Sequence, residues 1–162
     1  MPGSRAEGKE WIAERVIALE PVTICDVGAG VGTYWTLLAD SLPEARWTAV
    51  EIFEPYVAKF DLKDKYDSVI VGDFNDVDLQ PHDVVILGDV LDHVARPQIM
   101  WDKARSLGPT FAVVPLDHVE QGPVGGNPYE EHLHYFTHEE MMSMGGVTDY
   151  WVGPHKGCYV AR

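Results

Sequence analysis

The chain has 162 residues, of which 46% are hydrophobic and 23% charged, and its formal net charge is −14 at pH 7. This length suits a single domain over residues 1–162 with a sizeable core, and it excludes two ordinary domains. An acidic surface repels nucleic-acid phosphates and anionic membranes, and aspartates separate Lys59, Lys63 and Lys65. We therefore expect a small-molecule partner, with no nucleic-acid or membrane partner, while the oligomeric state stays open.

Cys25 and Cys158 are the two cysteines of the chain, and they form no C-x-x-C motif. Each lies in an expected strand, so we expect buried free thiols, which are typical of a reducing compartment. The chain shows no signal-peptide pattern and no apolar run long enough to span a bilayer. These features predict a cytoplasmic protein.

An amphipathic helix opens the predicted elements, because Ile12, Val16 and Leu19 recur at helical spacing and Pro21 ends the pattern. We expect this helix to cover one face of a sheet. The β-rich run Val22–Val27 follows as the first strand.

Three glycines at alternate positions, Gly28, Gly30 and Gly32, come after Asp26 in this strand. Glycines allow the backbone to turn sharply and to approach a ligand closely. A dinucleotide fingerprint, G-x-G-x-x-G, requires a glycine where this chain has Thr33. The observed pattern, D-x-G-x-G-x-G, resembles motif I of the class I methyltransferases that use S-adenosylmethionine. It favours that cofactor over a dinucleotide.

A helix over Tyr34–Asp40 and a strand over Arg46–Ile52 are predicted next, and Glu51 lies 19 residues beyond Gly32. Dinucleotide-type folds place their ribose-binding acid at about this distance from the glycines. A carboxylate suits that position because it accepts hydrogen bonds from both vicinal hydroxyls. A solvated acid at a strand end is the plainer interpretation.

A short helix from Pro55 precedes the third strand, Tyr66–Val71, which Gly72, Asp73 and Phe74 follow. In the class I methyltransferases, an acid after this strand accepts a hydrogen bond from the adenine amino group, and the next residue flanks the ring. Asp73 and Phe74 match these positions, although Gly-Asp is also an ordinary turn.

Asp83–Leu87 is a near-continuous apolar run, which is typical of a central parallel strand. The segment Asp89–His93, D-V-L-D-H, resembles the D-V-L-E-H that follows strand four in small-molecule methyltransferases. Ligands sit at the end of this strand in open α/β sheets. The resemblance implies that Asp89 contacts the cofactor. His93 is a candidate general base, or else a capping or core histidine.

A helix over Pro97–Leu107 and a strand over Thr110–Pro115 lead into an irregular stretch, Leu116–Phe136, which contains several glycine and proline turn signals. Its length and aromatic content favour an ordered, functional loop. We expect residues 116–136 to form a substrate lid, with His132 as the second candidate base. The candidate substrate contacts are Trp35, Tyr129 and Glu131.

Thr137 and Glu140 have the spacing of a capping box that opens a short helix. Val147–Val152 and Gly157–Ala161 then suit an antiparallel strand pair at the sheet edge. The predicted fold is α/β: a Rossmann-like, seven-stranded, mostly parallel sheet with helices on both faces and a C-terminal antiparallel hairpin. Class I methyltransferases share this strand count, and the stretch from Val114 also resembles small phage-type members.

The resemblance implies a methyltransferase that passes the methyl group of S-adenosylmethionine in line to an oxygen or nitrogen of a small molecule, leaving S-adenosylhomocysteine. The alternative is a non-catalytic adenosylmethionine-binding protein, or a partner subunit with this fold. His93, His132 and His134 are weak evidence for a metal, and we expect none. The residues implied in cofactor binding are Asp26, Gly28, Ala29, Gly30, Gly32, Glu51, Ile52, Asp73, Phe74 and Asp89.

Overall fold

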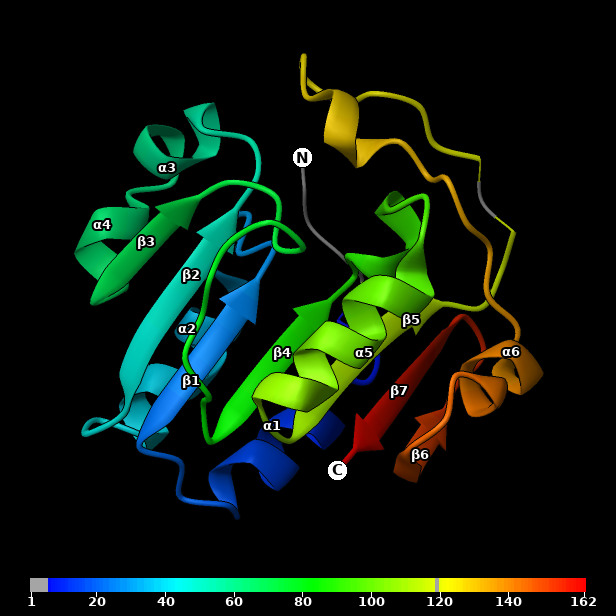
Figure 1. Cartoon of the computed structure of the whole chain (residues 1–162), viewed down its shortest axis with the longest axis horizontal. Helices are drawn as coiled ribbons and strands as arrows, with labels where there is room; N and C mark the ends of the chain where they lie inside the picture. The colour runs from blue at the N-terminus through cyan, green and yellow to red at the C-terminus, as the bar shows by residue number, and fades with distance from the viewer. Residues whose placement is uncertain (1–5, 119) are drawn as a thin grey trace.

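The computed structural model describes residues 6–118 and 120–162. Its centre is a seven-stranded sheet with the strand order β3-β2-β1-β4-β5-β7-β6 (Figure 1). The strands are β1 (Thr23–Val27), β2 (Arg46–Glu51), β3 (Ser68–Val71), β4 (Val84–Gly88), β5 (Thr110–Pro115), β6 (Val147–Val152) and β7 (Lys156–Ala161). The helices are α1 (Lys9–Ile17), α2 (Thr33–Leu38), α3 (Pro55–Lys59), α4 (Leu62–Lys65), α5 (Pro97–Leu107) and α6 (His138–Ser143). Three short 3-10 turns are η1 (Ala39–Ser41), η2 (Leu91–His93) and η3 (Pro128–Glu130).

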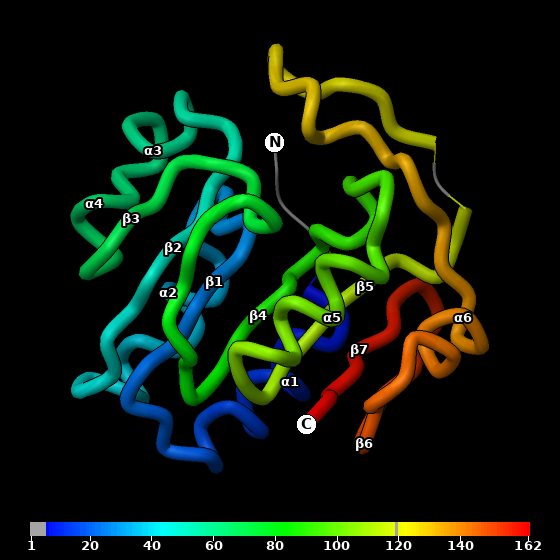
Figure 2. Tube along the Cα trace, viewed as in Figure 1, coloured from blue at the N-terminus to red at the C-terminus, as the bar shows by residue number. Residues whose placement is uncertain are grey.

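The predicted sheet architecture is confirmed. Strands β1 to β5 pair in parallel, whereas β7 pairs antiparallel with both β5 and β6. Because parallel strands end at one edge of the sheet, the loops after β1, β2, β3, β4 and β5 all lie together there. The segment 116–136 runs above this edge before the chain returns to α6 (Figure 2).

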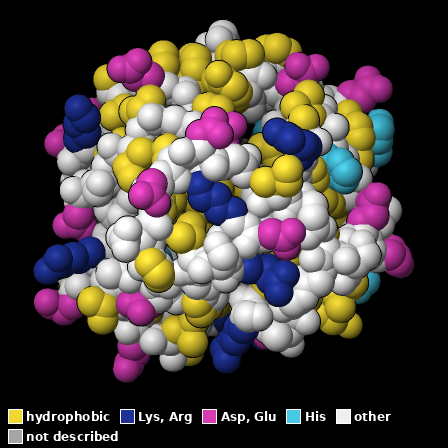
Figure 3. All heavy atoms as spheres, viewed as in Figure 1, with side chains coloured by type: hydrophobic (Ala, Val, Ile, Leu, Met, Phe, Trp, Pro, Cys, Tyr) yellow, Lys and Arg dark blue, Asp and Glu magenta, His cyan; other side chains and the backbone are white. Residues whose placement is uncertain are grey.

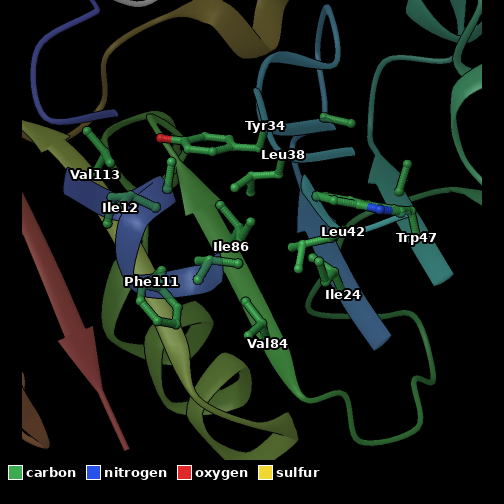
Figure 4. Close-up of a cluster of buried hydrophobic side chains, with 14 of the residues drawn as sticks. Ile12, Ile24, Tyr34, Leu38, Leu42, Trp47, Val84, Ile86, Phe111 and Val113 are labelled. Atoms are coloured by element: carbon green, nitrogen blue, oxygen red, sulfur yellow. The ribbon is translucent and has the colours of Figure 1, made fainter. Parts of the chain in front are cut away.

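Two apolar clusters, one on each face of the sheet, form the core. Ile24 of β1 belongs to the cluster that α1 and α2 cover, and its neighbour Cys25 belongs to the cluster that α5 covers. Figure 4 shows Ile12, Tyr34 and Leu38 from the helices meeting strand residues of the first cluster. Burial on both faces explains why the central strands read as apolar runs rather than as alternating patterns.

The first helix and strand are shorter than their apolar patterns predict. Helix α1 ends at Ile17, and Glu20 has a positive φ of 47° that turns the chain towards β1. Leu19 and Val22 therefore lie outside these elements and are exposed. Similarly, the predicted helix over Tyr34–Asp40 ends at Leu38 and continues as the turn η1.

Cys25 and Cys158 are both buried and free, and burial raises the pKa of each thiol to about 12. Since the thiolate is the reactive form, both thiols are unreactive near neutral pH. None of the helices in the described part of the chain has the length and apolar content needed to cross a bilayer.

Asp26 of β1 is a buried acid on the face of the sheet covered by α1 and α2. Its Oδ2 accepts a hydrogen bond of 2.6 Å from the hydroxyl of Tyr66. Burial raises the pKa of Asp26 to about 7, although the donation from Tyr66 opposes this rise. The folded protein therefore keeps this carboxyl protonated over a pH range in which the unfolded chain has already ionised it.

The first prediction concerns this acid. A raised pKa in the folded state means that stability falls as the pH rises between about 4 and 7 and then levels off. Asp26→Asn keeps an acceptor for Tyr66 and cannot ionise, so its stability relative to the native chain should increase from pH 5 to pH 8. Chemical denaturation at both pH values measures this difference.

The exposed acid Asp61 provides the matched control, because Asp61→Asn removes a carboxylate that solvent already screens. Its stability relative to the native chain should depend little on pH. An Asp26→Asn variant whose advantage is equal at pH 5 and pH 8 would show that Asp26 is ionised in the folded protein throughout this range.

Candidate functional site

The glycine turn after β1 has a conformation that side chains would prevent. Gly28, Gly30 and Gly32 have φ values of 67°, 53° and 79°, which lie in the left-handed region. A Cβ atom on Gly28 would lie 2.9 Å from Cγ2 of Val90, in the loop after β4. The turn thus brings bare backbone against the neighbouring loop, and this close approach explains the glycine pattern.

A cavity of about 340 Å³ opens at this edge of the sheet. The glycine turn, the ends of β2, β3 and β4, and the segment 116–136 form its walls. This volume lies in the usual range of small-molecule sites. The candidate residues that line the cavity are Gly28, Ala29, Gly30, Glu51, Ile52, Asp73, Phe74, Asp89, His93, Tyr129 and His132.

Four candidate residues lie elsewhere. Asp26 is in the core beside Tyr66, and Gly32 caps α2 behind the cavity wall. Trp35, in α2, packs against the core cluster instead of lining the cavity. The side chain of Glu131 is exposed, and only its backbone carbonyl reaches the site.

Glu51, at the end of β2, stabilises the glycine turn by hydrogen bonds. Its Oε2 accepts from the N–H of Gly30 and its Oε1 from the N–H of Phe53, both at 2.9 Å. Burial raises the pKa of Glu51, and these two backbone donors oppose the rise. A carboxylate oxygen has two acceptor positions. Each oxygen of Glu51 can therefore still accept from a ligand in the cavity.

Asp73 and Phe74 form the wall after β3. Oδ1 of Asp73 accepts from the N–H of Asn75 at 2.8 Å, which closes an Asx turn. Lys103 of α5 donates to the carbonyls of Asn75 and Val77, at 3.0 and 2.6 Å, and holds this turn against the sheet. The turn is thus fixed from two sides, with the ring of Phe74 anchored in the core.

Asp89 follows β4 in a left-handed conformation, with φ of 53°. Its Oδ1 accepts a hydrogen bond from Nζ of Lys156, and both side chains are largely buried. Oδ2 of Asp89 and the hydroxyl of Tyr34 are buried without hydrogen-bond partners among the described residues. Buried polar atoms of this kind mark a place for a polar ligand.

Asp92, His93 and His132 form a second polar group in the cavity wall. Oδ2 of Asp92 lies 3.3 Å from Nε2 of His132 and 3.5 Å from Nε2 of His93. Nδ1 of His93 donates to the carbonyl of Glu131 at 3.0 Å. Asp92 is almost completely buried, and burial raises the pKa of its carboxyl while the two histidines oppose the rise.

The segment 116–136, apart from residue 119, which lies outside the described residues, crosses the cavity as a roof. The backbone N–H groups of Leu133 and His134 donate to the carbonyl of Asp92, at 2.8 and 3.0 Å. At its far end, Oε1 of Glu130 accepts from the hydroxyl of Tyr56 in α3, at 2.9 Å. The segment is thus fastened on both sides of the opening.

The sequence analysis did not identify several residues of this site. Asp92 could have been identified, because it occupies the glutamate position of D-V-L-E-H beside His93. No sequence pattern indicates Lys156, since it reaches Asp89 only because β7 pairs with β5, where Lys156 lies opposite Pro115. Tyr56 likewise contacts Glu130 across 74 positions of the chain.

Comparisons with known proteins agree with this fold. A family profile described as "Methyltransferase domain" matches residues 25–108, just over half of the chain. No curated protein sequence matches the chain.

Solved structures with the same fold are numerous, and the four named here share between 13% and 18% identity with the chain. The N-terminal domain of EvdMO1, crystallised with S-adenosylhomocysteine and D-fucose, is 15% identical with a TM-score of 0.69; the match covers 99% of this chain and 85% of that one. Magnesium protoporphyrin IX methyltransferase of Synechocystis PCC 6803, with bound S-adenosylhomocysteine, is 16% identical with a TM-score of 0.67, covering 99% and 89%. An O-methyltransferase family protein of Burkholderia thailandensis is 13% identical with a TM-score of 0.67, covering 95% and 54%. The chain thus spans about half the length of that protein, and 56% of a similar one from Nostoc punctiforme PCC 73102.

The second prediction concerns the fastening of the roof. Tyr56→Phe removes the hydrogen bond to Glu130 and keeps the ring, so the roof should open more readily. One hydrogen bond contributes about 1 kcal/mol, so amide exchange at residues 128–132 should become about fivefold faster. Hydrogen exchange read by mass spectrometry measures this rate.

The exposed Tyr129, in the same roof, supplies the control Tyr129→Phe, which should leave the exchange unchanged. Equal exchange in the native chain and in Tyr56→Phe would mean that the contacts of Leu133 and His134 with Asp92 hold the roof without help from α3.

Proposed function

Because the chain belongs to the methyltransferase-domain family, we propose that it transfers a methyl group from S-adenosylmethionine to an oxygen or nitrogen atom of a small molecule. The observation that carries the proposal is the composition of the cavity. One part of the cavity wall consists of the backbone of the glycine turn together with Glu51. Another part consists of the group of Asp92, His93 and His132. The roof over both parts leaves room for a small acceptor.

The glycine turn and the walls after β2, β3 and β4 fit the cofactor. S-adenosylmethionine supplies an electrophilic methyl group on a positively charged sulfur. The free acceptor positions of Glu51 suit ribose hydroxyls, and Asp73 and Phe74 suit the adenine. The unpartnered Oδ2 of Asp89 suits a positively charged part of the cofactor, because a buried carboxylate is stabilised by an opposite charge.

The rest of the cavity would hold the acceptor. A fastened roof limits the entry of water and restricts how an acceptor can lie, which favours an in-line displacement. An oxygen or nitrogen acceptor loses a proton during the reaction, and the group of Asp92, His93 and His132 would accept this proton or assist its loss. The face in Figure 3 shows Lys and Arg side chains scattered singly among acidic ones, as suits a small acceptor.

The third prediction is that the protein binds S-adenosylhomocysteine and not NAD. Gly28, Gly30 and Gly32 leave room for the former, and Thr33 stands where a dinucleotide site requires glycine. Titration calorimetry with each ligand decides between them. Binding of NAD without a response to S-adenosylhomocysteine would exclude the proposed cofactor.

The same titration tests the role of Glu51. In Glu51→Ala, the affinity for S-adenosylhomocysteine should fall about 10- to 150-fold, which corresponds to about 1.5–3 kcal/mol for hydrogen bonds to a charged acceptor. The control Glu54→Ala, in the same loop, removes an exposed acid. Equal affinities in both variants would mean that Glu51 serves only the glycine turn.

The fourth prediction concerns turnover with labelled S-adenosylmethionine and a fractionated cell extract as the source of acceptor. His132→Ala should lower the rate of methyl transfer about 100- to 10,000-fold, because the variant lacks the imidazole that assists removal of the acceptor's proton. The affinity for S-adenosylhomocysteine should stay unchanged, since His132 faces the acceptor. Full turnover in this variant would remove His132 from the chemistry, and a lost affinity for the cofactor would make its role structural.

A further inference from the structure

We propose that Asp92, His93 and His132 together bind one divalent transition-metal ion, with Zn²⁺ the best match, in the wall of the cavity. Binding itself follows from these three side chains, whereas the role given to the ion below rests on the proposed function. The sequence alone favoured no metal, because His93, His132 and His134 at unknown distances from one another are weak evidence for a site. The structure instead brings Asp92 into the group.

The spacing of the three side chains fits one ion. Nε2 of His132 and Nε2 of His93 lie 3.3 and 3.5 Å from Oδ2 of Asp92, and all three ligand atoms lie within 4.8 Å of one another. In a tetrahedral zinc site with bonds of about 2.0–2.1 Å, neighbouring ligand atoms lie about 3.3–3.4 Å apart. The separation of 3.3 Å therefore lies in the range that coordination requires, and the separation of 3.5 Å exceeds it by about 0.1 Å.

The orientation of His93 is the one that a metal ligand needs. Its Nδ1 lies 3.0 Å from the carbonyl oxygen of Glu131, and a carbonyl can only accept, so Nδ1 carries the hydrogen. In the neutral ring, Nε2 then presents its lone pair to the carboxylate of Asp92. Metal-binding histidines commonly have such a carbonyl partner on the other ring nitrogen, which fixes the tautomer.

A cation suits this arrangement of ligand atoms. The rings of His93 and His132 lie with their centroids 4.9 Å apart, and Nε2 of each ring lies close to the same carboxylate oxygen, Oδ2 of Asp92. One divalent ion accepts both lone pairs and the carboxylate together. It also suits Oδ1 of Asp92, which is buried without a hydrogen-bond partner among the described residues.

The position of the site indicates what the ion would do. His93 and His132 both line the cavity, so a three-ligand ion there keeps a coordination position open to the acceptor, as catalytic zinc sites do. An acceptor with a hydroxyl group could bind at that position with a lowered pKa and would release its proton to water. With the ion bound, the three side chains would thus act on this proton through the metal and would not accept it themselves. We therefore assign the acceptor to the class of hydroxylated small molecules.

The ion would also hold the roof closed. His132 belongs to the roof, whereas Asp92 and His93 belong to η2 on the sheet. The backbone bonds from Leu133 and His134 to the carbonyl of Asp92 already join the two parts. A metal bond would add a side-chain link at the same place and fix the roof over the acceptor.

The test uses the full chain, freed of metal with a chelator that is then removed. Calorimetry should show one equivalent of Zn²⁺, and Co²⁺ should develop the visible absorption bands of a four- or five-coordinate site. In His132→Ala and in Asp92→Asn, the affinity for Zn²⁺ should fall at least about 10-fold, and the Co²⁺ bands should disappear. Zn²⁺ should raise the Tm of the native chain by about 3 °C or more, and should not raise that of the variants.

His134→Ala is the matched control, because His134 lies in the same roof outside the three-residue group, with its ring against Phe136. It should bind Zn²⁺ like the native chain. The proposal is overturned by a native chain without stoichiometric binding, or by equal losses in His134→Ala and His132→Ala. If Asp92→Asn does not fold, as circular dichroism would show, His132→Ala decides alone.

The metal titration needs neither cofactor nor acceptor, so it separates the two proposals. Zn²⁺ binding that depends on His132, in a chain that ignores S-adenosylhomocysteine, would keep the metal site and remove the methyltransferase function. Binding of S-adenosylhomocysteine with methyl transfer that a chelator leaves unchanged, and no Zn²⁺ binding, would keep the function and remove the metal site.

Discussion

The whole site depends on the reversal of strand order between β1 and β4. Strand β2 pairs on one side of β1 and β4 on the other, and the cavity lies at the carboxyl ends of these strands, where the strand order reverses. The backbone at Gly28 passes so close to Val90 that the first wall of this opening tolerates no side chain there.

Three acids near this edge, Asp26 and Glu51 in full burial and Asp89 in partial burial, are each stabilised in a different way. Asp26 has a hydroxyl donor and a pKa raised to about 7, so near neutral pH it is partly protonated. Glu51 accepts from two backbone N–H groups, and Asp89 pairs with Lys156. These differences follow from depth: the acid inside the core has one donor, whereas those in the wall have access to loop backbone or to a cation.

The roof gives this short chain an enclosed cavity without an inserted domain. It starts from β5, crosses to α3 through the contact of Glu130 with Tyr56, and returns along η2 to α6. Asn127 at its tip is buried, and its side chain accepts from the N–H of Tyr129 at 2.9 Å, which caps η3. The segment that the sequence predicts as a loop is therefore ordered, because its backbone polar groups have hydrogen-bond partners within the segment and in η2.

Local patterns were sufficient for the sheet and for the glycine turn. A left-handed glycine conformation, an acid at a strand end and an apolar run are each properties of a few adjacent residues, so Gly28, Glu51 and Asp73 were identified before the fold was known. Tertiary structure decided which candidate residues face the cavity. Asp26 points into the core and Trp35 of α2 packs against the core cluster, because a strand or helix alone does not say which face is covered. It also brought Lys156 to Asp89 and His132 to Asp92, since those contacts require the pairing of β7 with β5 and the return of the roof across the sheet, and no short stretch of sequence contains either event.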